Sequence, residues 1–397
     1  MTVKQPSNRL LALDILRGIT IAGMILVNNP GSWGHIFAPL EHASWNGLTP
    51  TDLVFPFFMF IMGISTYISL RKYEFKPSKD LIWKILKRTI IIFAIGLGIA
   101  WFSRFCYGLA GSIMNPETQL PLWAMVLDAA NSFDTIRALG VMPRLALCYG
   151  AASIIAITVN HKYLSWTIAG ILVVYSILLI FGNGYEFSDT NIISIVDHSV
   201  LGANHMYSDT VNDVTLKFDP EGFLSTLPSI AHVLIGFLCG IKLMSTKDNY
   251  ERITNLFIIG VILTFSGFLL SYGLPMNKKI WSPTFVLTTC GLAASLLGLL
   301  IWIIDIKGYK AWCRFFEAFG INPLFMYVLG AVLGILFGSI RVPGTDGLTI
   351  KNTIYQNVLI PMVGDETFAS LIYALLFIAL NWSIGYILYK KKIYIKI

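Results

Sequence analysis

Charged residues are scarce in this sequence. Asp, Glu, Lys and Arg make up only 13% of the 397 residues, whereas hydrophobic residues make up 55% and the mean hydropathy is +0.69. An ordinary soluble domain carries about 25% charged residues. The composition therefore excludes a typical soluble globular protein and indicates a membrane protein.

Sequence motifs of several well-known chemistries are also missing. The five cysteines include no CxxC pair and do not form the pattern of a disulfide framework. No GxSxG motif marks an activated serine, and no HExxH motif supplies metal-ligand spacing. We therefore expect neither a disulfide scaffold nor a bound metal.

Long apolar runs are abundant. A bilayer core about 30 Å thick requires roughly 20 apolar residues per helix, so each run can cross a membrane once. Barrel strands are excluded, because they are about 10 residues long and alternate in polarity. The runs lie near residues 10–28, 52–70, 83–103, 138–158, 163–181, 223–243, 253–272, 282–304, 315–338 and 367–389. We predict an all-α polytopic membrane protein with about ten transmembrane helices, built as a single domain over residues 1–397.

The net charge of +7 is explained by the orientation of these helices. When the N-terminus is placed inside, most of the 29 Lys and Arg residues fall in inner segments, which is the positive-inside bias. Both termini are therefore expected to be cytoplasmic, and the basic residues report a lipid bilayer and not nucleic acid. The first run follows Lys4 and Arg9 without a small-residue cleavage site, so we interpret it as a retained membrane helix. The polar, acidic outer segment 182–222 is expected to form a small cap.

Reactive side chains crowd the segment EHASWNGLTPTDLVFPFFMF, residues 41–60. The topology brings Asn28, His42 and Asp52 to one face of the membrane, near one another. Each residue also has a purely structural interpretation. Asn28 lies at a helix end before Pro30, Asp52 follows Thr49 with the spacing of a capping box, and a histidine in an outer loop is usually solvated.

The functional interpretation joins the three side chains. An imidazole can accept and return a proton near neutral pH, and a carboxylate on its second nitrogen fixes the tautomer. An asparagine amide can donate a hydrogen bond to a carbonyl oxygen that becomes negative. A base, an orienting group and an oxyanion donor are the groups required for acyl transfer.

Several phrases of this sequence resemble one known family. HASWNGLTPTDLVFPFFMFIMG closely resembles the heparan-α-glucosaminide N-acetyltransferases and their bacterial relatives of the NagX type. Further similar phrases occur along residues 9 to 335: RLLALDILRGITIAGMILVNN, RALGVMPRLALCY, FDPEGFLSTLPSIAHVLIG, PMNKKIWSPTFVLTT and GINPLFMYVLG. The first phrase is long and specific enough to exclude a chance match.

The resemblance implies an acetyl-CoA-dependent acetyltransferase with a transmembrane acyltransferase fold. The active-site histidine of the family falls on His42, its aspartate on Asp52 and its asparagine on Asn28. The loop before His42 is slightly longer here and a second asparagine, Asn29, follows, so the choice of Asn28 depends on the preceding valine. We expect no metal, and we expect acetyl-CoA to donate its acetyl group to the amine of glucosamine or of a glucosamine-terminated saccharide.

His42 would act as a base or as an acetyl carrier, at the outer face of a bacterial inner membrane. Two alternatives remain open: an O-acetyltransferase of a cell-surface glycan, and an amino-sugar transporter. The oligomeric state also remains open, and a homodimer is one option.

Further residues are candidates for substrate contacts. Because CoA is anionic, the inner cations Arg17, Lys84 and Arg88 are candidates for holding it, although Asp14 lies three residues before Arg17 and can form an ion pair with it. Arg137 and Arg144 at the entry of the 138–158 run, and Asn322 before Pro323 at a broken helix, are further cofactor candidates. For the sugar we consider Glu41, Trp45 and Asn46, although Trp45 also fits an interfacial aromatic belt.

Overall fold

The computed structural model describes residues 10–115, 120–345 and 347–395. Within these residues, nine helices are long and apolar enough to cross a membrane, and a bent pair supplies a tenth crossing. The prediction of an all-α polytopic membrane protein with about ten spans is confirmed. The helices that supply the spans are α1 (Leu11–Asn28), α2 (Val54–Leu70), α3 (Lys79–Met114), α5 (Val141–Thr158), α6 (Leu164–Phe181), α8 (Thr226–Ser245), α9 (Asn249–Leu270), α10 (Pro283–Ile301), α12 (Pro323–Ser339) and α15 (Glu366–Lys390).

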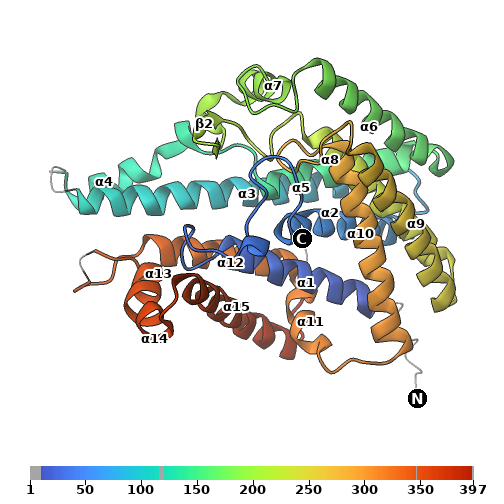
Figure 1. The fold of residues 1–397 in the computed structure, drawn as a ribbon. Coiled ribbons are helices and arrows are strands. Elements are labelled where there is room, and N and C mark those ends of the chain that lie inside the picture. Colours follow the sequence, from blue (N-terminus) through green and yellow to red (C-terminus); the bar gives the residue numbers. More distant parts are fainter. Residues whose placement is uncertain (1–9, 116–119, 346, 396–397) are drawn as a thin grey trace.

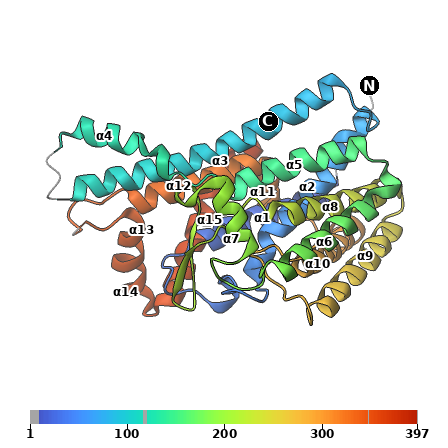
Figure 2. The same cartoon turned by 90° about the horizontal axis from the view of Figure 1, so that it is seen from above.

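Helix α3 is much longer than the predicted run 83–103. It begins after Ser78, whose side chain accepts a hydrogen bond from the Leu81 amide, and continues for 36 residues. Its last turns extend beyond the bundle, where α4 (Leu122–Ala130) lies beside them (Figures 1 and 2). The apolar run predicted too short a length for α3, because only the part of a helix that crosses the bilayer has to be apolar.

The predicted run 315–338 is broken at Asn322, as the Asn322–Pro323 sequence suggested. Helices α11 (Cys313–Ile321) and α12 meet at an angle of 87°. Proline disfavours helical geometry in the residue that precedes it, and Asn322 has φ −121° and ψ 57°. Helix α11 therefore leaves the direction of α12 and crosses α1, where Gly18 and Gly320 allow the two backbones to touch.

Residues 182–222 fold at one end of the bundle. They form α7 (Ile192–Leu201) and an antiparallel hairpin of β1 (Ser208–Val211) and β2 (Val214–Lys217), with Ser208 opposite Lys217. Figure 1 shows α7 and β2 together at the top of the view, above α3 and α5. This segment, here called the cap, positions the residues that follow it, up to the start of α8.

Shorter elements complete the chain. A π-helical turn, Trp302–Ile306, extends α10, and a second one, Thr353–Leu359, lies between α13 (Ile350–Asn352) and α14 (Ile360–Val363). Short 3-10 turns occupy Ala38–Leu40, Pro50–Leu53, Arg71–Tyr73, Ser132–Thr135, His161–Tyr163 and Ala203–His205. The turn Pro50–Leu53 is the one that builds the candidate site.

Candidate functional site

The loop between α1 and α2 is fixed at both ends. Near α1, the amides of Gly31 and Ser32 donate to the carbonyl and the hydroxyl of Ser370, at 3.2 and 3.0 Å. His35 also reaches Glu366, with 2.6 Å between Nε2 and the carboxylate. The first half of the loop is therefore attached to the start of α15, and its second half is left to carry His42.

Asp52 both caps the start of the 3-10 turn before α2 and contacts the imidazole of His42, and it uses a different carboxylate oxygen for each. Oδ2 accepts from the Thr49 amide at 3.1 Å, and the Asp52 amide donates to the Thr49 hydroxyl oxygen at 3.4 Å, which completes a capping box with Pro50 at the first position. The Ala43 amide donates to Oδ2 of Asp52 at 3.1 Å. Oδ1 lies 2.6 Å from Nδ1 of His42. This capping box thus holds the Asp52 carboxylate in the position that orients the imidazole.

The contact with Asp52 fixes the tautomer of His42. An ionised carboxylate can only accept a hydrogen bond, so Nδ1 carries the proton and Nε2 retains its lone pair. The Asp52 side chain is 1% exposed, whereas the His42 side chain is 43% exposed. The ring therefore presents a basic nitrogen outward from a buried orienting group, which is the arrangement of a general base or nucleophile.

Lys278 is a third member of this cluster, and the sequence reasoning did not single it out. It lies in the connection between α9 and α10, and its Nζ is 3.3 Å from Asp52 Oδ1. The same Nζ is 3.0 Å from Nδ1 and 3.4 Å from Nε2 of His42. Burial lowers the pKa of Lys278 below its usual value, and the negative charge of Asp52 opposes that shift. The only available signal was its place within the phrase PMNKKIWSPTFVLTT.

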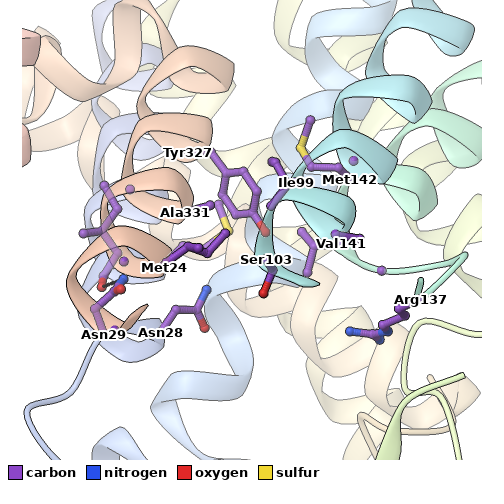
Figure 3. Close-up of a pocket in the computed structure, with 18 of the residues that line it drawn as sticks. Met24, Asn28, Asn29, Ile99, Ser103, Arg137, Val141, Met142, Tyr327 and Ala331 are labelled. Carbon is purple, nitrogen blue, oxygen red and sulfur yellow. Dashed lines mark hydrogen bonds between the residues drawn. The ribbon is translucent and has the colours of Figure 1, made fainter. Parts of the chain in front are cut away.

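A cavity of about 640 Å³ lies between α1 and α12 on one side and α3 and α5 on the other (Figure 3). Its walls are mostly apolar, with polar side chains from several segments. Asn28 and Arg137 line it, but His42 and Asp52 do not. Among the lining residues are Met24, Asn28, Asn29, Ile99, Ala100, Ser103, Arg104, Arg137, Val141, Met142, Tyr327, Ala331 and Lys351.

The neighbouring residues Asn28 and Asn29 differ in the hydrogen bonds of their side chains. Asn29 donates from Nδ2 to the Ile25 carbonyl at 2.9 Å, so its amide serves the end of its own helix. Within the described chain, the side chain of exposed Asn28 makes no hydrogen bond. Figure 3 shows both residues at the α1 side of the cavity, opposite Arg137. Asn28 is therefore the asparagine whose amide is available to a ligand.

Arg137 is held between the cavity and the last residues of the cap. Its guanidinium donates to both oxygens of Asp219, from Nε at 2.9 Å, and also to Glu221. Burial alone would lower the pKa of Arg137, but the hydrogen bond to Asp219 and the charge of Glu221 raise it above its usual range. Arg137 thus stays a cation at the cavity wall, while its two carboxylates neutralise it.

Arg144 lies away from the cavity. It is fully buried, it donates to the Gly222 carbonyl at 3.0 Å and to the Ser225 hydroxyl, and it lies over the Trp281 ring at 5.2 Å. These contacts join α5 to the start of α8. Its expected contact with the cofactor remains a prediction, and its visible partners are structural.

The inner candidates are also engaged with the protein. Arg17 pairs with Asp14 at 3.0 Å, as the alternative interpretation required, and it also donates to Ser65 at 2.8 Å. Lys84 donates to the Tyr73 hydroxyl at 2.9 Å. Arg88 lies 4.6 Å from the ring centre of Tyr149.

Asn322 holds the C-terminal segment. Its Nδ2 donates to the Ile393 carbonyl at 2.8 Å, and its Oδ1 accepts from the Ile395 amide at 2.9 Å. Both ends of the amide are therefore occupied by the polypeptide chain. The role of Asn322 toward the cofactor stays a prediction, in competition with this contact.

The three residues considered for the sugar lie around the same loop. Trp45 donates to the Tyr185 carbonyl at 2.7 Å and packs against Phe187 and Phe218, so its indole anchors the loop to the cap. Asn46 accepts from Asn277 at 3.2 Å, which ties the loop to the segment that carries Lys278. Glu41 is exposed, and its carbonyl accepts from Thr49 at 2.7 Å. The structure thus gives Trp45 and Asn46 clear positioning contacts.

Comparison with known proteins supports the resemblance. No family model matches the chain. It is 27% identical over 454 aligned residues, which cover 100% of this chain, to heparan-alpha-glucosaminide N-acetyltransferase of Mus musculus. It is 29% identical over 447 residues, or 98% of this chain, to the protein of the same name from Homo sapiens. The chain spans 62% and 60% of the lengths of these relatives. It is therefore related to heparan-α-glucosaminide N-acetyltransferase over nearly its whole length, as the motifs indicated.

Proposed function

We propose that this multi-pass membrane protein transfers the acetyl group of cytosolic acetyl-CoA to the amine of glucosamine, or of a glucosamine-terminated saccharide, at the outer face of a bacterial inner membrane. The observation that carries the proposal is the contact of 2.6 Å between His42 Nδ1 and Asp52 Oδ1. It leaves Nε2 of an exposed imidazole available in the segment that most resembles the acetyltransferases. The relatives named above support the reaction class.

The geometry is compatible with two routes of acetyl transfer. In the first, His42 Nε2 removes a proton from the acceptor amine while the nitrogen attacks the thioester carbonyl; a C–N bond forms, the C–S bond breaks, and CoA leaves as a thiolate that takes up a proton. In the second, Nε2 attacks the thioester first, and the acetyl group then passes from the ring to the amine. Asp52 orients the ring in the same way in both routes.

The cavity between the helices would supply space for a substrate arm. It is lined along α12 from Tyr327 to Gly338. Eleven residues of helix correspond to about 16 Å, which is long enough for an extended chain between helices. Asn28 at the end of α1 would then meet the arm with a free amide. The acidic cap would attract a cationic amino sugar to the same side.

The test uses the purified protein with acetyl-CoA carrying a radioactive acetyl group. We expect the wild type to acetylate glucosamine, and His42→Ala to lose at least about 10²-fold in kcat, because general base catalysis contributes about that much. His35→Ala is the matched control: His35 lies in the same loop but contacts Glu366. Near-normal turnover by a correctly inserted His42→Ala would exclude the proposal.

The same reagent separates the two routes when the acceptor is left out. A stable label on the wild type that is absent from His42→Ala supports the acetyl-carrier route. Transfer without any label before addition of acceptor supports direct attack. Assays with a glycan that offers only hydroxyl groups test O-acetylation, and uptake of unmodified glucosamine into vesicles without acetyl-CoA tests transport.

A further inference from the structure

We propose that Lys278 is a catalytic residue, whose ammonium group stabilises the anion that forms beside His42 Nε2 during acetyl transfer. The inference rests on the proposed function and adds a residue to it. Asn28 was the candidate for this task from the sequence. Among the described residues, however, no hydrogen bond joins Asn28 to His42, whereas Lys278 touches the ring directly.

The position of the Lys278 ammonium group favours this role. It lies 3.4 Å from Nε2, the nitrogen that faces the reacting atoms, and 3.3 Å from Asp52 Oδ1. A carbonyl carbon in position to react lies about 3 to 3.5 Å from the attacking atom. In the acetyl-carrier route the attacking atom is Nε2, and a carbonyl oxygen turned toward Lys278 would lie within hydrogen-bonding distance of its ammonium. A preorganised donor at this place is worth a factor of about 10²–10³ in kcat.

The proton balance is simple. Lys278 keeps its protons and donates a hydrogen bond to the oxygen as it becomes negative. When CoA leaves, the C=O bond forms again, the C–S bond breaks and the negative charge departs on the thiolate sulfur, so Lys278 neither gains nor loses a proton. The proton of the acceptor amine still goes to His42, and the acetyl group still moves from sulfur to nitrogen.

The backbone around Lys278 is firmly held. Its neighbour Asn277 donates from Nδ2 to Asn46 at 3.2 Å and accepts from the Ile280 amide at 3.1 Å. The Tyr175 hydroxyl donates to the Ile280 carbonyl at 2.6 Å. Trp281 is buried with φ +52°, a conformation that a bulky residue rarely adopts and that persists only where the surroundings enforce it. The segment is thus built to place one lysine against the histidine.

The charges around the ammonium are few and specific. Asp52 and His42 face Lys278 from the α1–α2 connection, and the charge of Glu221 acts on it from the last residues of the cap. The positive charge of the adjacent Lys279 also acts on Lys278, but the Lys279 ammonium pairs with Asp209 of the cap at 2.6 Å. Two consecutive lysines therefore have different partners, and Lys279 provides a matched control.

The kinetic experiment compares Lys278→Met, Lys278→Arg and Lys279→Met with the wild type. We expect Lys278→Met to lose about 10²–10³-fold in kcat, with KM for acetyl-CoA changed less than about threefold. Lys278→Arg should regain part of the loss, because it restores the cation. Lys279→Met should keep kcat within about threefold. A Lys278→Met protein with near-normal kcat would overturn the inference.

A second measurement does not require acetyl transfer. The rate at which diethyl pyrocarbonate modifies His42, followed by mass spectrometry across pH 5 to 9, reports how the ring titrates. Removing a cation at 3.0 Å favours a positive charge on the ring, so in Lys278→Met the half-maximal rate should move to higher pH. Lys278→Arg and Lys279→Met should keep the wild-type profile.

The two measurements separate the possible failures. A wild type that transfers no acetyl group refutes the proposed function, while the modification profile still shows whether Lys278 places its charge on His42. An unchanged profile in Lys278→Met contradicts the inference whatever the activity of the wild type. Loss of kcat in Lys278→Met together with the upward shift supports both proposals.

Discussion

Asp197 in helix α7 is a buried carboxylate with an unusual environment. Its Oδ1 accepts from the Leu224 amide at 3.0 Å, while its Oδ2 is buried without a hydrogen-bond partner among the described residues. Burial raises the pKa of Asp197 from 3.8 to about 6, although the Leu224 amide and the charge of Arg144 lower it. Between pH 4 and 6, the folded state therefore keeps a proton that the unfolded state has lost, and this contribution to stability decreases as pH rises.

The expected consequence is a pH-dependent gain from Asp197→Asn. At pH 7.5 the variant should be more stable than the wild type by about 1–3 kcal/mol, since a shift of one pKa unit corresponds to about 1.4 kcal/mol. At pH 4.5 most of this difference should disappear. Thermal unfolding in detergent at both pH values measures it. Asp213→Asn, at an exposed turn of the hairpin, is the control; equal effects of Asp197→Asn at both pH values would contradict the prediction.

At the residue scale, the sequence predicted the reactive pair but not its full environment. The spacing from Thr49 to Asp52 indicated a capping box, and a base at His42 would require a carboxylate partner. In the structure, Asp52 forms the capping box and also contacts His42. The contacts of Lys278 were not predictable from local spacing, since its partners are more than 200 residues away along the chain. Charge type and motif membership alone do not determine which of two adjacent lysines reaches the histidine.

At the scale of elements, helices α2 and α8 pack backbone against backbone. A Cβ atom at Gly236 would overlap the Phe60 carbonyl, and one at Gly63 would overlap the Val233 carbonyl. The two backbones therefore touch because both positions lack a side chain, as is common where membrane helices pack. This contact sets α8 against the helix that begins directly after Asp52.

We predict that Gly236→Ala destabilises the protein, although alanine favours a helix by about 1 kcal/mol over glycine. Overpacking at this contact costs about 1–3 kcal/mol or more, because a carbonyl oxygen cannot move aside without moving α2. Thermal unfolding in detergent should show a lower midpoint. Gly170→Ala in α6 is the control, since a Cβ there meets no atom within 4 Å. The prediction is wrong if both variants unfold at the wild-type temperature.

Helix existence was easier to predict than helix ends. Apolar length identified the spans, because the bilayer demands it of every crossing helix. It did not show that α3 continues to Met114, or that α11 turns by 87° away from α12. The break itself was visible in the Asn322–Pro323 sequence, but its angle depends on the contact of α11 with α1.

At the scale of the whole molecule, the site is assembled from distant segments. The loop after α1 supplies His42, the turn before α2 supplies Asp52, and the connection before α10 supplies Lys278. The cavity is formed mainly by α1, α3, α5 and α12 (Figure 3). Apolar length and local motifs do not determine how these helices pack against one another, and the cavity therefore could not be predicted from the sequence.

The cavity gives the last prediction. If a substrate arm lies in it during the reaction, filling it should weaken binding without changing the base. Ala100 lines the cavity from α3, and Ala100→Trp would occupy much of the space near Ser103 and Met24. We expect KM for acetyl-CoA or for the acceptor to rise at least about tenfold, because steric exclusion from a binding site costs at least about 1.4 kcal/mol. Steady-state kinetics with each substrate varied in turn identifies which of the two enters the cavity.

The control lies two residues away on the same helix. Gly98 is exposed, a Cβ there meets no atom within 4 Å, and it does not line the cavity. Gly98→Trp places the same side chain on the exposed face of α3, away from the cavity, and should leave both KM values within about threefold of the wild type. Equal effects of the two tryptophans on KM would contradict the prediction, because bulk inside the cavity would then matter no more than bulk outside it.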